Sequence, residues 1–223
     1  MVIFSIMDAR GRIRNWCLGF GLTMLGVIIS YFWIDGPVAY FVHANVVQKS
    51  AFIWMQRLPE TLPLFSAIAL VAAGLWTLIG RTISRCLSVM LLCGLSFIAA
   101  GALNNQLKFA FGRMWPETWV NNNPSLIQNG AYGFSPFHGG PGFASFPSGH
   151  TAAICSVAAV LWLCYPRWRL LFALLVAIVV IGLLGADYHF VSDILAGGFV
   201  GWTTGWMAIE MSRRWSFTGP TQK

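Results

Sequence analysis

Long apolar runs, separated by short polar stretches, follow one another along almost the whole chain. The runs are continuous rather than alternating, which predicts helices instead of the strands of a barrel. A helix needs about 20 mostly apolar residues to cross a bilayer. Six runs come near or reach this length, and we expect each to be a membrane span: about 16–34, 62–80, 86–107, 147–164, 170–186 and 190–211. The first run is too long for a signal-peptide core, so we expect it to stay as an anchor.

Composition supports a membrane protein. Hydrophobic residues make up 57% of the 223 residues and charged residues only 9%, whereas a soluble domain has about 25% charged residues. The five cysteines are odd in number and lie in or beside apolar runs, so we interpret them as small buried residues rather than disulfides. We therefore predict one all-α integral membrane domain over residues 1–223, a bundle of six transmembrane helices.

Two polar intervals interrupt the runs. Residues 35–61 are mixed in character, and we expect a short helix at the membrane surface or a loop there. Residues 112–146 form the one long polar interval, rich in Asn, Gly, Pro and aromatic residues, which is typical of an ordered functional loop. We expect this loop to be extracytoplasmic.

The basic residues orient the predicted bundle. Cytoplasmic loops carry an excess of Lys and Arg. If the N-terminus is cytoplasmic, ten basic residues fall on that side: Arg10, Arg12, Arg14, Arg81, Arg85, Arg167, Arg169, Arg213, Arg214 and Lys223. Only four fall outside: Lys49, Arg57, Lys108 and Arg113. This bias favours six spans with both termini cytoplasmic, and it accounts for the net charge of +7 without nucleic acid as a partner.

In this topology, three polar groups lie at the outer ends of different spans. Lys108 and Arg113 follow the third span, Ser148-Gly149-His150 begins the fourth, and His189 and Asp193 begin the sixth. Pro147 suits the first turn of a helix, so the helix should begin there and offer free N–H groups to an anion next to Gly149. Asp193 lies one helical turn after His189 and can accept a hydrogen bond from its ring. Ionisable groups at membrane depth are usually functional.

Together these residues resemble a known family. Lys108, the segment Phe146-Pro-Ser-Gly-His-Thr151 and the segment His189-Phe-Val-Ser-Asp193 are similar to the three-part signature of the phosphatidic acid phosphatase type 2 superfamily. The membrane members of this family are six-span enzymes whose site faces away from the cytoplasm.

The resemblance implies a role for each matching residue. His189 would be the nucleophile and become phosphohistidine, Asp193 would orient it, and His150 would protonate the leaving oxygen. The phosphoryl oxygens would be held by a set of four residues: Lys108, Arg113, Ser148 and Gly149. No metal or other cofactor is expected, and the sequence shows no metal-ligand spacing.

Two positions depart from the family pattern. Trp115 stands before Pro116 where the family has Arg, and Leu183 stands six residues before His189 where the family usually has another Arg. Neither side chain replaces a bidentate guanidinium. We consider three consequences: weaker binding of phosphate, a preference for a particular lipid head group, or transfer to an acceptor other than water.

The sequence thus predicts a metal-independent lipid phosphate or diphosphate phosphatase, acting at the extracytoplasmic face of a bacterial inner membrane, with the site towards the periplasm or exterior. The candidate substrates are a polyprenyl diphosphate, phosphatidic acid, phosphatidylglycerol phosphate and a glycolipid phosphate. The alternatives are a lipid phosphotransferase with the same chemistry and a non-catalytic lipid-phosphate binder or transporter.

Four further polar residues give weaker indications of function. His43 and His138 fit exposed loop histidines, with contact to substrate as the alternative, and Asp187 and Glu117 are candidates to modulate His189. In the last run, Gly197, Gly201 and Gly205 recur every four residues, which predicts close packing of that helix within the bundle rather than dimerisation.

Overall fold

The structure is a computed structural model that describes residues 9–119 and 122–214. Residues 1–8, positions 120 and 121 of the predicted loop, and the basic tail beyond 214 with Lys223 lie outside the described residues. The described part is helical and contains isolated β-bridges but no strand. The prediction of an all-α fold is confirmed at this level.

The N-terminal helix is longer than its apolar run. Helix α1 (Ala9–Ile29) continues through the π-helical turn η1 (Ser30–Ile34) directly into α2 (Asp35–Asn45). A short helix, α3 (Ser50–Gln56), and a 3₁₀ turn, η2 (Leu58–Thr61), complete the first mixed interval. This interval is therefore mostly helical. Of the short helix and the loop that we considered for it, the helix is correct.

The remaining elements correspond to the other five runs and the loop between them. They are α4 (Leu62–Leu78), α5 (Arg85–Phe111), α6 (Leu126–Asn129), η3 (Pro141–Phe143), α7 (Gly149–Cys164), η4 (Pro166–Trp168), α8 (Arg169–Gly185) and α9 (Val191–Arg214). Thus the long polar interval contains a short helix, a 3₁₀ turn and irregular backbone.

Within the described residues, four helical stretches are long and apolar enough to cross a membrane: Arg10–Asn45, Leu58–Leu78, Arg85–Phe111 and Pro166–Gly185. Helix α7 is apolar but shorter, and α9 is not among the four. The structure therefore supports a membrane protein with at least these candidate spans, while six spans and cytoplasmic termini stay predictions.

Helices α7 and α9 pack closely at the centre of the bundle. A Cβ added at Gly201 would lie 2.8 Å from both the Cβ of Cys155 and the backbone N of Ser156, and Gly197 and Gly205 approach the same helix or its cap. The glycine spacing therefore makes room for α7, as expected from its four-residue period.

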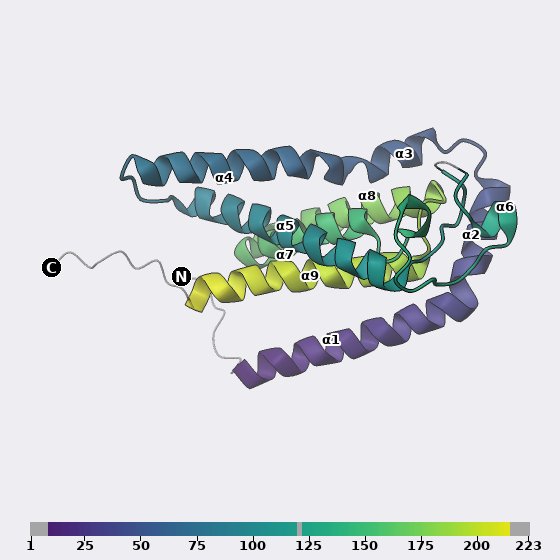
Figure 1. Cartoon of the computed structure of the whole chain (residues 1–223). Helices are drawn as coiled ribbons and strands as arrows, with labels where there is room; N and C mark the ends of the chain where they lie inside the picture. The colour runs from purple at the N-terminus through teal and green to yellow at the C-terminus, as the bar shows by residue number, and fades with distance from the viewer. Residues whose placement is uncertain (1–8, 120–121, 215–223) are drawn as a thin grey trace.

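The two ends of the bundle differ in character. The start of α1 and the end of α9 lie at one end, where Arg12 Nε is 3.2 Å from Glu210 Oε2, and the turn between α4 and α5 lies at the same end (Figure 1). Helices α2 and α6 lie at the opposite end, with the loop that follows α5 (Figure 1). The predicted site residues gather at that opposite end.

Candidate active site

The N-terminus of α7 forms one wall of the site. Ser148 is the N-cap: its hydroxyl oxygen accepts from Thr151 N at 3.4 Å and from Thr151 Oγ1 at 3.0 Å. The helix begins at Gly149, two residues after the Pro147 start that we predicted, because Ser148 takes the extended backbone of a cap. The N–H groups of Gly149 and His150 have no acceptor within the helix, since they belong to its first turn.

Helix α5 brings a cation to this terminus. A Cβ built on Gly149 would lie 3.6 Å from Lys108 Nζ and 3.5 Å from Asn104 Nδ2, so both side chains pass close over the glycine. Asn104 is buried and donates from Nδ2 to the carbonyl oxygen of Pro147 at 3.2 Å. The amide therefore ties α5 to the segment that leads into α7, and Lys108 lies where an anion at the helix terminus would be bound.

His189 and Asp193 form the second wall. His189 Nδ1 lies 3.3 Å from Asp193 Oδ2, and both residues are buried. The same carboxylate oxygen accepts from Ser145 Oγ at 2.6 Å and from the backbone N of Phe190 at 3.1 Å. The Phe190 contact resembles half of a capping box, since a carboxylate in the first turn of α9 satisfies an N–H at its start. With Nδ1 directed at Asp193, Nε2 is the ring nitrogen that remains for substrate.

Arg113 lies behind Asp193. Its guanidinium is fully buried; Nη1 is 2.5 Å from Asp193 Oδ1, and Nη2 is 2.8 Å from Asp35 Oδ2. Nη1 also donates to Ser192 Oγ at 2.5 Å, and Asp35 Oδ1 accepts from the backbone N of Ser192 at 3.0 Å. The arginine thus joins α2, the loop after α5 and the start of α9. Two of its three guanidinium nitrogens contact protein carboxylates. From the sequence we expected this guanidinium to contact the phosphate of the substrate instead.

Four aromatic rings surround the Arg113 guanidinium. Its Cζ lies 4.2 Å from the ring centroid of Phe190 and between 5.1 and 5.4 Å from those of Phe134, Tyr31 and Tyr132. Such rings attract a cation through their faces and exclude water from it. Burial by itself would lower the pKa of Arg113, but the carboxylates of Asp193 and Asp35 raise it above its ordinary value. Arg113 therefore stays charged.

The second histidine faces the first across the site. The ring centroids of His150 and His189 are 6.5 Å apart, and the Tyr188 ring lies at a steep angle to both, 5.8 Å from His150 and 5.4 Å from His189. Burial lowers the pKa of His189, although Asp193 opposes the shift, so the imidazole is neutral over a wider pH range than in water.

The two positions that depart from the family pattern have clear structural roles. The Trp115 ring lies 5.1 Å from that of His189, and its Nε1 donates to the carbonyl oxygen of Pro141 at 2.7 Å. Leu183 is fully buried in an apolar cluster with Ile154, Val179 and Ile194. Trp115 therefore shields the buried histidine, and Leu183 contributes to the packing between α7, α8 and α9.

The structure thus brings together five of the predicted site residues: Lys108, Gly149, His150, His189 and Asp193. Ser148 adjoins them as the cap of α7, and Arg113 stands behind Asp193.

Sequence reasoning missed Asp35, Ser145, Ser192 and Asn104. A signal existed for Asp35, because a carboxylate at the end of a long apolar run is costly unless it is paired. The other three are short polar side chains with no distinguishing pattern.

The chain is similar to one known family and to two curated proteins. The family model described as the PAP2 superfamily matches residues 89–217. Two curated relatives carry the name lipid A 1-phosphatase, one from Rhizobium etli and one from Rhizobium johnstonii. Each is 32% identical over 117 residues, which cover 52% of this chain and 47% and 45% of the two relatives. The chain therefore spans about half the length of these relatives. No solved structure matches significantly.

Proposed function

The chain belongs to the PAP2 superfamily, and from this premise we propose that it is a phosphatase that removes phosphate from a lipid phosphate or diphosphate. The observation that carries the proposal is the pairing of His189 Nδ1 with Asp193 Oδ2 at 3.3 Å, opposite a second imidazole. A nucleophile oriented by a third group, with an acid on the far side of the substrate, is what phosphoryl transfer through a covalent intermediate requires. A binder or transporter needs neither.

In the proposed reaction, Nε2 of neutral His189 attacks phosphorus. The new P–N bond forms as the bond from phosphorus to the lipid oxygen breaks, and His150 gives its proton to that oxygen. Water then attacks the phosphohistidine while His150 takes a proton from it, the P–N bond breaks, and phosphate leaves. Asp193 accepts from Nδ1 throughout and stabilises the positive charge on the ring.

The phosphoryl oxygens are proposed to bind at the start of α7. Lys108 supplies a fixed positive charge, and the N–H groups of Gly149 and His150 supply donors that need no reorganisation. The Ser148 hydroxyl can donate its proton, since its oxygen already accepts from Thr151. Arg113 is assigned a different task from the one expected from sequence: it positions Asp193. This chemistry uses no metal ion.

The orientation and substrate belong to the same proposal. The site lies at the end of the bundle opposite the Arg12–Glu210 pair and the basic turn between α4 and α5. Because basic residues favour the cytoplasmic face, we propose six spans in an inner membrane with the site towards the periplasm or exterior. Because the relatives are named lipid A 1-phosphatases, we propose a phosphorylated glycolipid of that kind ahead of the other lipid phosphates.

Transfer of the phosphoryl group to a lipid hydroxyl is the second candidate. Trp115, Tyr188 and Trp119 form consecutive aromatic contacts beside His189, with ring centroids 5.0 to 5.3 Å apart. An aromatic wall at this position favours an apolar acceptor over free water.

The test is phosphate release by purified protein in detergent, with EDTA present, from a panel that includes lipid A, phosphatidic acid and a polyprenyl diphosphate. We expect release from at least one lipid, and a loss of about 10⁴-fold or more in the His189→Ala variant. The matched control is His138→Ala, an exposed histidine of the loop, which should retain activity. No release, together with a labelled phosphate that moves between lipids, would instead identify the transferase.

A further inference from the structure

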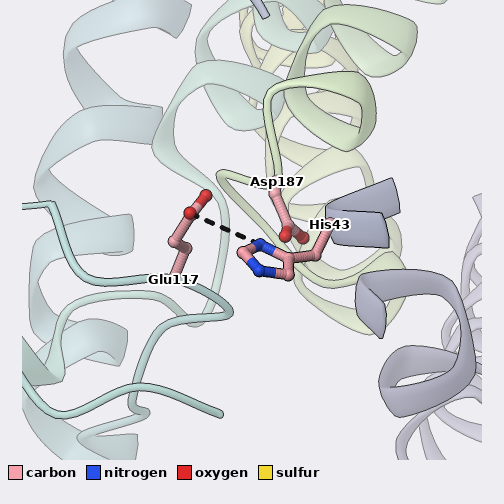
Figure 2. A group of neighbouring side chains, drawn as sticks. All are labelled: His43, Glu117 and Asp187. Atoms are coloured by element: carbon pink, nitrogen blue, oxygen red, sulfur yellow. Dashed lines mark ion pairs between the residues drawn. The ribbon is translucent and has the colours of Figure 1, made fainter. Parts of the chain in front are cut away.

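A second polar cluster lies beside the active site and is made of His43, Glu117 and Asp187 (Figure 2). His43 comes from the last turn of α2, Glu117 from the loop after α5, and Asp187 from the turn between α8 and α9. One imidazole nitrogen and one oxygen from each carboxylate all lie within 4.8 Å of one another. His43 Nδ1 is 3.5 Å from Glu117 Oε1. None of the three is among the residues that we assign to phosphoryl transfer.

Asp187 is the buried member of this cluster. It is only 2% exposed, and within the described residues its Oδ2 has no hydrogen-bond partner. A buried carboxylate oxygen that accepts no hydrogen bond is energetically unfavourable, so its position needs a physical reason. Its backbone has a φ of 57°, and its N–H donates to Leu184 O at 2.9 Å, so the turn itself holds the residue in place. Figure 2 shows the carboxylate directed towards His43 and Glu117.

One cation already contacts the cluster. Lys49 Nζ lies 2.5 Å from Glu117 Oε2 and 3.9 Å from Asp187 Oδ2, the second distance being too long for a hydrogen bond. Two carboxylates therefore share one ammonium group, and the closer contact is the one to Glu117. Lys49 comes from the segment between α2 and α3, and its ammonium group is the cation that an incoming metal ion would displace from Glu117.

We propose that His43, Glu117 and Asp187 bind a divalent transition-metal ion such as Zn²⁺, in exchange for the ammonium of Lys49. One imidazole nitrogen with two carboxylate oxygens is a donor set that suits Zn²⁺ better than Mg²⁺, which prefers oxygen alone. Three protein ligands leave coordination positions for water or a substrate group. The ion would join α2 to the loop and to the turn two residues before His189, and its role is to hold these segments together.

The experiment measures Zn²⁺ binding by isothermal titration calorimetry to the full chain, purified without a histidine tag and in the absence of lipid. We expect one Zn²⁺ per chain, bound at least about tenfold more weakly by the His43→Ala variant. The Lys49→Met variant should bind more tightly than wild type, because it removes the competing cation. The His138→Ala variant is the matched control and should bind as wild type does.

Absence of Zn²⁺ binding by the wild-type protein overturns the proposal. So does equal binding by the wild-type and His43→Ala proteins, which would assign the ion to another site such as the cysteines. Because His43 is exposed, its substitution should leave folding intact, and thermal unfolding without Zn²⁺ checks this. The titration needs no turnover, so its outcome is independent of whether the phosphatase proposal holds.

Discussion

Arg113 Nη1 lies 2.5 Å from Asp193 Oδ1, and this contact joins the loop after α5 to the carboxylate that orients His189. The same guanidinium reaches Asp35 at 2.8 Å through Nη2. An arginine that two buried carboxylates hold in a fixed fork positions a third group better than it binds a mobile substrate. The candidate site therefore has its positive charge in two places: Lys108 at the helix terminus, and Arg113 beside the carboxylate of the His189–Asp193 pair.

The Arg113→Met variant should be strongly destabilised. Removing the guanidinium leaves Asp35 and Asp193 buried together without their cation, and breaking a buried pair in this way costs about 3–5 kcal/mol. The free energy of unfolding in detergent, or the shift in Tm, measures the loss.

The double variant Arg113→Met/Asp35→Asn tests the reason for that loss. It should be more stable than Arg113→Met alone, because one of the two uncompensated carboxylates is gone. A double variant that shows the full sum of the two single losses would contradict this account of the network.

The Ser145→Ala variant should lose turnover and keep its affinity for substrate. Ser145 Oγ donates to Asp193 Oδ2 at 2.6 Å, and a hydrogen bond to a charged group contributes about 1.5–3 kcal/mol. We expect kcat to fall about tenfold or more with KM nearly unchanged, since the residue acts through Asp193. Ser135→Ala, in the same loop, is the control. A rise in KM alone would show that Ser145 contacts the substrate.

The pH profile should report the burial of His189. Protonation removes the nucleophile, and burial lowers the pKa of this residue below its ordinary 6.5. The acid limb of kcat/KM should therefore lie below pH 6.5, with activity lost as pH falls through it. In the Trp115→Ala variant, which exposes the ring, the limb should move to higher pH. Recording both profiles with EDTA keeps bound metal from affecting the result. If the acid limb of kcat/KM lies at the same pH in the Trp115→Ala variant and the wild type, Trp115 does not shield His189.

Close packing of α9 on α7 predicts a contrast between two glycines. A Cβ at Gly201 meets backbone and side-chain atoms of α7, whereas a Cβ at Gly101 on α5 meets nothing within 4 Å. Gly201→Ala should cost about 1–3 kcal/mol of stability. Gly101→Ala should be neutral or stabilising by up to about 1 kcal/mol, because Ala favours helix more than Gly does. Similar Tm values for the two variants would show that α9 can move away from α7.

The parts of the fold that follow from local sequence were predictable. Apolar runs give long helices, and Pro147 predicted the start of α7 to within two residues, because periodicity and helix starts depend on neighbouring residues. The i, i+4 spacing of His189 and Asp193 likewise predicts their contact.

Long-range contacts were not predictable in this way. Asp35 and Arg113 are 78 residues apart, and nothing local indicates that the arginine turns away from the helix terminus towards two carboxylates. Ser145 lies at the end of the long polar interval 112–146, where a serine beside a proline-broken turn has many possible partners. The meeting of His43, Glu117 and Asp187 depends on three separate segments and needed the structure.

The position of Asp35 has a consequence for chimeras in which segments of this chain are exchanged with those of related proteins. The family match begins at residue 89, yet the Arg113 within it depends on a carboxylate at residue 35. A chimera that joins residues 89–217 of this chain to the N-terminal helices of another protein would inherit the arginine without its second counter-ion. Helix α2 thus contributes a carboxylate to the candidate site from outside the family match, and we expect the two parts of the chain to work only when they are exchanged together.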